Sequence, residues 1–126
     1  MFSVGTAGSV NNSPDTYVAY CFAQVAGYSA FGSYTGNGSA DGVFVYTGFL
    51  TKFLIVKRID AINDWYIWDT ARNTYNVIGE ELYANLANAG ANATDLDVNS
   101  NGFKLRSTSS AFNASGGTYI YYAVAS

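Results

Sequence analysis

The 126-residue sequence contains no histidine, a single cysteine and a single proline. Histidine is the commonest general base and metal ligand, so its absence excludes a Ser-His triad and weakens the case for a metal site. Cys21 has no partner for a disulfide within the chain. It lies in the apolar stretch Tyr17–Ala23, where we expect a small, buried thiol. We therefore predict no metal, no cofactor and no enzymatic activity.

Charge is also scarce, because Asp, Glu, Lys and Arg make up only 12% of the residues. The net charge is −3, and the six basic residues are dispersed along the chain, which is not the pattern of a nucleic-acid-binding surface. No apolar run approaches about 18 residues, the length of a membrane-spanning helix. The first residues show neither the basic nor the apolar region of a signal peptide. We expect neither nucleic acid nor a membrane as a partner.

What the sequence does contain favours strands. Hydrophobic residues reach 49%, aromatic residues reach 17%, and 13 glycines help to separate short apolar runs. This pattern predicts one domain with a single core, an all-β fold built as an antiparallel, jelly-roll-like β-sandwich. The expected strands cover Tyr17–Ala23, Val43–Phe49, Phe53–Ile59, Asp64–Asp69, Phe103–Ser107 and Thr118–Ala125.

One segment competes as a helix. Gly79–Asn88 carries Leu82 and Leu86 four positions apart, two acidic residues in its first turn, and Gly90 beyond its end. We predict at most one short helix in the chain, and we place it there.

The two ends of the chain carry similar sequences. Asn11–Ala23 aligns without a gap with Asn113–Ala125, and six of the thirteen positions are identical. Chance similarity between strands is one explanation, and duplication is the one we favour. Residues 1–13 have too few apolar side chains to fold alone, so we predict an N-terminal arm over 1–13 and one β-domain over 14–126.

The repeat predicts self-association, in which the arm completes a sheet of a neighbouring copy and builds a homo-oligomer or a helical fibre. We expect the contacts to involve six apolar or aromatic residues from the two ends of the chain, namely Phe2, Val4, Val10, Tyr17, Tyr119 and Tyr121.

An ordered set of motifs runs through most of the chain: Phe31–Gly38, Val45–Phe49, Ile55–Arg58, Trp65–Arg72, Ser100–Ser107 and Asn113–Tyr121. This set resembles a β-rich domain that recurs in tailed-bacteriophage virion and tail-fibre-like proteins. The resemblance implies a structural or host-recognition role in an extracellular particle, with no established activity. Together with the repeat, it predicts a non-enzymatic subunit of a phage-like fibre or appendage.

The alternative function is binding of surface glycans by a host-recognition module. Trp65 and Trp68 could stack on sugar rings, while Asp69 and Arg72 could bind hydroxyl groups, with help from Tyr66 and Asn76. The structural explanation of the same segment is that alternation buries one aromatic set, either Trp65 with Ile67 or Tyr66 with Trp68. We expect at least one of the two sets to lie in the core.

Two further patterns could carry chemistry. Asp97–Gly102 matches the opening of a calcium-binding loop but lacks its closing glutamate, and an Asn-Gly turn explains the same residues more simply. The acidic residues Asp60, Asp64 and Asp69, or Glu80 and Glu81, could pair across a glycosidase cleft. Their positions at strand ends are more typical of solvated turns.

Overall fold

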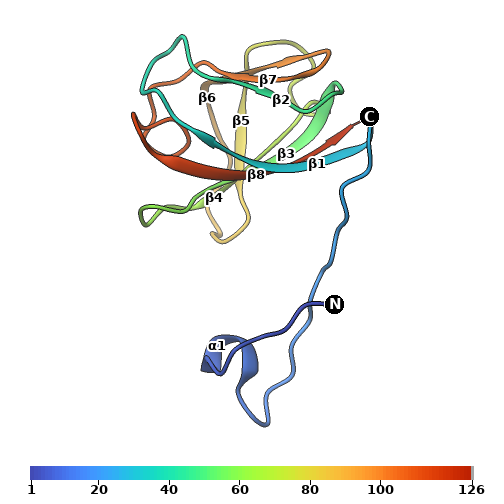
Figure 1. Ribbon diagram of the computed structural model, residues 1–126. Coiled ribbons are helices and arrows are strands. Elements are labelled where there is room, and N and C mark those ends of the chain that lie inside the picture. The colour runs from blue at the N-terminus through green and yellow to red at the C-terminus, as the bar shows by residue number, and fades with distance from the viewer. Residues whose placement is uncertain (126) are drawn as a thin grey trace.

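The computed structural model describes residues 1–125 and shows an all-β chain (Figure 1). Its eight strands are β1 Ser29–Thr35, β2 Phe44–Tyr46, β3 Thr51–Arg58, β4 Trp65–Asp69, β5 Ile78–Tyr83, β6 Ala91–Asn99, β7 Gly102–Leu105 and β8 Thr118–Ala125. One helix of four residues, α1 Gly8–Asn11, lies near the N-terminus. Within the described residues, no helix has the length and apolar character needed to cross a membrane.

The strands form one continuous antiparallel sheet with the order β1-β8-β3-β4-β5-β6-β7-β2. Strands β3 to β7 follow one another as a meander, and β8 returns to lie between β1 and β3. The sheet curves so that its two halves face each other, as Figure 1 shows. This confirms the predicted all-β antiparallel fold, with two layers that are halves of one sheet. The edge strands β1 and β2 are each paired on one side only.

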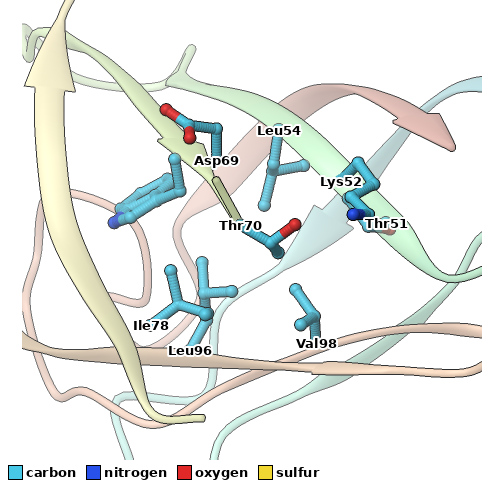
Figure 2. A pocket seen from close by; sticks show the side chains of 9 residues that line it. Thr51, Lys52, Leu54, Asp69, Thr70, Ile78, Leu96 and Val98 are labelled. Atoms are coloured by element: carbon cyan, nitrogen blue, oxygen red, sulfur yellow. The ribbon is translucent and has the colours of Figure 1, made fainter. Parts of the chain in front are cut away.

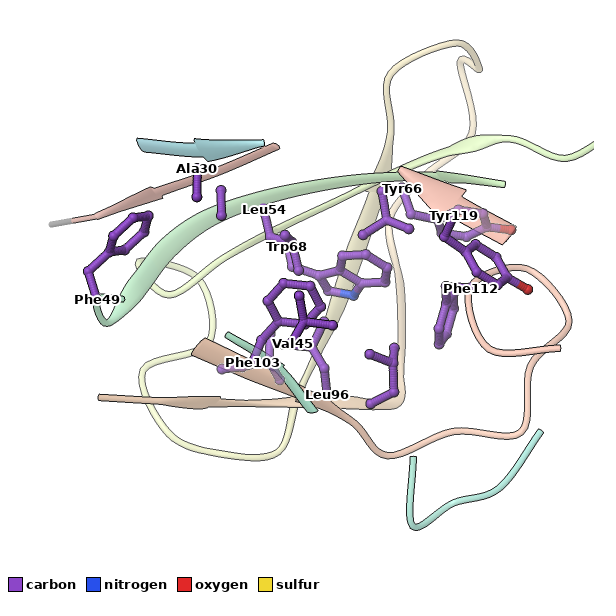
Figure 3. Packing of buried hydrophobic residues seen from close by; sticks show 14 residues of the cluster. Ala30, Val45, Phe49, Leu54, Tyr66, Trp68, Leu96, Phe103, Phe112 and Tyr119 are labelled. Atoms are coloured by element: carbon purple, nitrogen blue, oxygen red, sulfur yellow. The ribbon is translucent and has the colours of Figure 1, made fainter. Parts of the chain in front are cut away.

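The core lies between these halves because side chains alternate along each strand. In β8, Tyr119 and Ala123 are buried, whereas Ile120 and Tyr122 between them face outward. Figure 3 shows the resulting aromatic and aliphatic cluster. Its largest members are Trp68, Tyr119, Phe103 and Phe112, all of them 2% exposed or less.

The helix predicted over Gly79–Asn88 does not form, because its first half is strand β5. This strand lies between β4 and β6 and is paired with both. Leu82 and Leu86, which suggested a helical face, are both exposed. A Cβ atom at Gly79 would overlap the carbonyl oxygen of Ala93, so this glycine permits a close approach of β6. Pairing on both sides decides the structure of the segment.

The strand predicted over Tyr17–Ala23 does not form either. The first 28 residues are exposed throughout, and the chain joins the sheet only at Ser29. Figure 1 shows this segment leaving the domain beside the end of β8 and extending away from it, with α1 far from the sheet. We refer to residues 1–24 as the arm. Cys21 lies in the arm and is exposed, so the expectation of a buried thiol is wrong.

Candidate association surfaces

The tip of the arm has a defined local structure. The hydroxyl of Tyr17 donates to the carbonyl oxygen of Gly8 at 2.8 Å and accepts from the backbone N–H of Asn12 at 2.9 Å. The side chains of Phe2, Val4, Val10 and Tyr17 line a single hollow with Val18. The four arm residues predicted to mediate association are therefore gathered in one place, and their apolar surfaces remain largely exposed.

The last part of the chain repeats this local structure. The hydroxyl of Tyr119 donates to the carbonyl oxygen of Ser110 at 3.0 Å and accepts from the N–H of Ala114 at 2.7 Å. Tyr119 corresponds to Tyr17 in the alignment of the two chain ends. When the alignment is extended toward the N-terminus with the same spacing, Ser110 and Ala114 correspond to Gly8 and Asn12.

The backbone hydrogen bonds of the two turns correspond as well. The N–H groups of Val10 and Asn11 both donate to the carbonyl oxygen of Ala7, and that of Asp15 donates to Asn12. Their counterparts follow the same pattern, since Phe112 and Asn113 both donate to Ser109 and Gly117 donates to Ala114. Chance similarity of sequence does not require a shared hydrogen-bond pattern, so the structure supports duplication. We refer to residues 107–125, which end with β8, as the closing segment.

Beyond this turn the arm, unlike the closing segment, has no neighbouring strand. The side chains of Val18, Tyr20 and Phe22 are 79%, 82% and 63% exposed. Their counterparts in β8 are Ile120, Tyr122 and Val124, which share one face of a paired strand. The arm therefore presents a row of large apolar side chains and an unpaired backbone, both of which favour addition to a sheet.

A second apolar surface covers the outside of the sheet half that contains β1, β8, β3 and β4. In the strand register, Phe31 lies opposite Tyr122, Tyr122 opposite Ile55, and Ile55 opposite Ile67. The rings of Phe31 and Tyr122 are stacked with centroids 4.5 Å apart, and Phe22 of the arm reaches the same ring at 5.2 Å. We refer to this surface as the outer face. Phe22 contacts this surface, but most of the arm stays exposed.

Two predicted association residues lie elsewhere. Tyr119 is 0% exposed and belongs to the core, so the prediction that it forms an interface is wrong. Tyr121 points to the same side, with its ring edge-on to Phe103 at 5.5 Å, and burial raises the pKa of its phenol. Strand β8 has a neighbour on each side, β1 and β3, so it has no free edge to offer.

The residues predicted to bind sugars do not form one site. Trp68 is 1% exposed and its indole N–H donates to Asp95 at 3.0 Å, so it has no ring face for a sugar. Asp69 is paired with Arg72 at 2.6 Å. Only Trp65 presents an exposed ring, and it lies beside the outer face. The predicted Trp65–Trp68 platform is therefore wrong. The expectation that at least one of the two aromatic sets is buried is confirmed, and the buried set is Tyr66 with Trp68.

The sequence analysis missed a buried acidic pair, Asp95 and Glu81. Asp95 is 1% exposed, and Glu81 is nearly as buried and accepts a hydrogen bond from the hydroxyl of Tyr83 at 2.6 Å. Burial raises the pKa of Asp95 to about 6, the hydrogen bond from Trp68 opposes this, and the nearby Glu81 adds to it. Neither carboxylate is placed to reach a substrate. The sequence drew attention to Asp95 only as a neighbour of the calcium-like motif, and no sequence signal marked it as buried, since it stands among other polar residues of β6.

Most of the remaining acidic residues have structural partners. Asp97 and Asn99 belong to β6, and Gly102 begins β7, so the calcium-like motif is the turn of a hairpin. Arg106 lies 3.4 Å from Asp97, Arg58 pairs with Asp60 at 2.8 Å, and Asp64 accepts from Asn85. Residues 1–125 contain no group of three or more acidic, cysteine or histidine side chains that could hold a metal ion.

One small cavity lies at the end of the core, and Figure 2 shows its lining. The hydroxyls of Thr51 and Thr70 are buried there without hydrogen-bond partners, above the aliphatic side chains of Ile78, Leu96 and Val98. Its volume of about 10 Å³ is close to the space that one water molecule needs. It therefore cannot admit a sugar or another organic substrate.

Together, these features define a small all-β domain with two exposed apolar surfaces, one of which is an arm that repeats the turn preceding the last strand of the domain. The chain belongs to the family described as a domain of unknown function, DUF7483, which matches residues 1–126. No curated protein and no solved structure matches the chain.

Proposed function

We propose that this protein is a non-enzymatic structural subunit that self-associates through its N-terminal arm. The observation that carries this proposal is the arm itself. It repeats the hydrogen-bonded turn that precedes β8, yet its strand-like part, Thr16–Ala23, lies unpaired with large apolar side chains exposed. Burying side chains of this size contributes roughly 1.5–3 kcal/mol each, which is sufficient to drive association through a few contacts.

The rest of the molecule supports the same role. The edges of β1 and β2 are unpaired on their outer sides, and the outer face adds an apolar area on which subunits could pack laterally. Because only one of the two predicted sugar-stacking rings, that of Trp65, is exposed, the geometry favours self-association over glycan binding. An extracellular fibre or appendage of phage-like type is the setting that the sequence resemblance implies, and it forms part of this proposal.

Sedimentation velocity of the full chain over a wide concentration range tests the proposal. The parent should associate as its concentration rises. The triple variant Val18→Ser, Tyr20→Ser, Phe22→Ser should need at least about tenfold higher concentration, because each tenfold change corresponds to 1.4 kcal/mol of lost contact.

A matched control is the double variant Ile62→Ser, Tyr75→Ser, which removes equally exposed apolar side chains outside the arm. It should associate like the parent. A parent that stays monomeric at every concentration, or an arm variant that associates as well as the parent, would refute the proposed function.

A further inference from the structure

The hydrogen bonds of two corresponding asparagines show what the arm lacks. Asn113 is fully buried, and its amide nitrogen donates to the carbonyl oxygens of Ser107 at 2.7 Å and Ser39 at 2.8 Å. Its side-chain oxygen accepts from the N–H of Asn37 at 3.0 Å. Asn11 keeps only the first of these bonds, donating at 2.8 Å to Gly5, the counterpart of Ser107.

The hydrogen bonds that Asn113 makes and Asn11 lacks all involve a single loop. Asn37 and Ser39 lie in the loop that follows β1, and this loop holds the closing segment against the rest of the domain. The arm therefore has the asparagine that makes this contact, Asn11, but no loop against which Asn11 could pack. The same holds for its strand, since β8 is held between β1 and β3 whereas Thr16–Ala23 has neither neighbour.

We propose that the arm is the closing segment of a second domain of this same fold. Its partner is a second copy of residues 24–102. Phe2–Val4 of the arm resemble Phe103–Leu105 and take their place in the β7 of that copy, and the strand Thr16–Ala23 lies between its β1 and β3. This inference goes beyond the proposed association. Between full chains the arm can pair with a free edge such as that of β1, because β8 already fills the position between β1 and β3; a copy without a closing segment leaves that position open.

The alternation of side chains fits this position. Tyr17 takes the place of the buried Tyr119, and Cys21 and Ala23 take those of Ala123 and Ala125. Val18, Tyr20 and Phe22 then continue the outer face in place of Ile120, Tyr122 and Val124. Cys21, which is exposed in the free arm, becomes as inaccessible as Ala123, which is 0% exposed.

Three differences decide which copy can receive the arm. Ala19 and Val10 are smaller than their counterparts Tyr121 and Phe112, and Pro14 lacks the N–H that Gly116 donates to Gly36. The arm therefore fits the position less tightly than the closing segment of the same domain, and it does not displace that segment. Its partner is a copy without a closing segment of its own, so a series of such domains can be joined end to end along one polypeptide.

The test is a fusion that places a copy of residues 24–102 directly in front of Phe2 of the full chain. The added segment has no closing segment except the arm. Two folded domains should result, with about twice the calorimetric unfolding enthalpy of the full chain. In dilute solution Cys21 should react with maleimide at least about tenfold more slowly than in the full chain, because it is buried in the new core.

Two variants of the fusion keep the test independent of self-association. Tyr17→Asp places a charge in the new core and should leave the added segment unfolded, while the same change in the full chain lies on the exposed arm and should leave its domain intact. Ala19→Tyr restores the ring of Tyr121 and should raise the unfolding temperature of the added domain.

An added segment that stays unfolded with Cys21 fully reactive would overturn the inference, and so would a fusion that folds equally well with Tyr17→Asp. Neither result depends on whether the full chain associates in the sedimentation experiment. The proposed function and this inference can therefore fail separately.

Discussion

At the scale of single residues, the most unusual group is the buried carboxyl of Asp95. It lies in the core, bonded to the indole of Trp68 and close to Glu81. Its pKa rises from 3.8 to about 6 because burial penalises the charged form most strongly. A group whose pKa is higher in the folded than in the unfolded state stabilises the fold while it is protonated.

This linkage sets the direction of the pH dependence. The contribution of Asp95 should be fully present below pH 3.8 and should be lost as the pH rises through about 6. A shift of about two units corresponds to about 3 kcal/mol in the free energy of unfolding, at 1.36 kcal/mol per unit. Urea unfolding between about pH 4.5 and 7.5 should show this loss in the parent, and Asp95→Asn should remove it.

Asp64→Asn is the control, since the side chain of Asp64 accepts a hydrogen bond from Asn85 at the exposed edge of the domain. It should leave the parental slope unchanged. Identical slopes for the parent and Asp95→Asn would show that Asp95 does not titrate in this range.

The sequence could predict that one aromatic set of β4 is buried, because strand alternation requires it. It could not predict that Tyr66 and Trp68 are the buried set and Trp65 the exposed one. That choice depends on which face of β4 meets the opposite half of the sheet, and the partners concerned, Asp95 and Phe112, are far away in sequence.

At the scale of elements, a substitution in β5 distinguishes the helix predicted over Gly79–Asn88 from the observed strand. In a helix, replacing Gly79 by alanine would stabilise the protein by roughly 0.5–1 kcal/mol. In the observed strand, the new methyl group would overlap the backbone of Ala93, and such overpacking destabilises by about 1–3 kcal/mol. Thermal or urea unfolding of Gly79→Ala should therefore show lower stability. Gly5→Ala should be neutral, because nothing lies near that position. A stabilised Gly79→Ala would contradict the strand.

The strands β2, β3, β4, β7 and β8 were all anticipated from apolar alternation between turns. Strands β1 and β6 were missed because they are rich in glycine or polar residues, and their pairing with strands elsewhere in the sheet holds them in place. The opposite error occurred at Tyr17–Ala23. Its pattern is that of a strand, but a strand needs a neighbour, and the chain provides none there.

At the scale of the whole molecule, the fold is a nearly closed sheet with a segment left outside it (Figure 1). The sequence repeat predicted that the two ends of the chain are related, and the shared hydrogen bonds of Tyr17 and Tyr119 support that relation. Sequence alone could not show that the C-terminal repeat is buried and the N-terminal repeat exposed. The central claim is that the arm becomes ordered when it pairs with another domain of this fold.

Backbone hydrogen exchange of the arm in the full chain, followed by mass spectrometry over a concentration series, tests this claim most directly. The amides of Thr16–Ala23 should exchange rapidly in dilute solution, because they are unpaired, and at least about tenfold more slowly in concentrated solution, where strand pairing protects them. Equally rapid exchange of these amides at all concentrations would contradict the account.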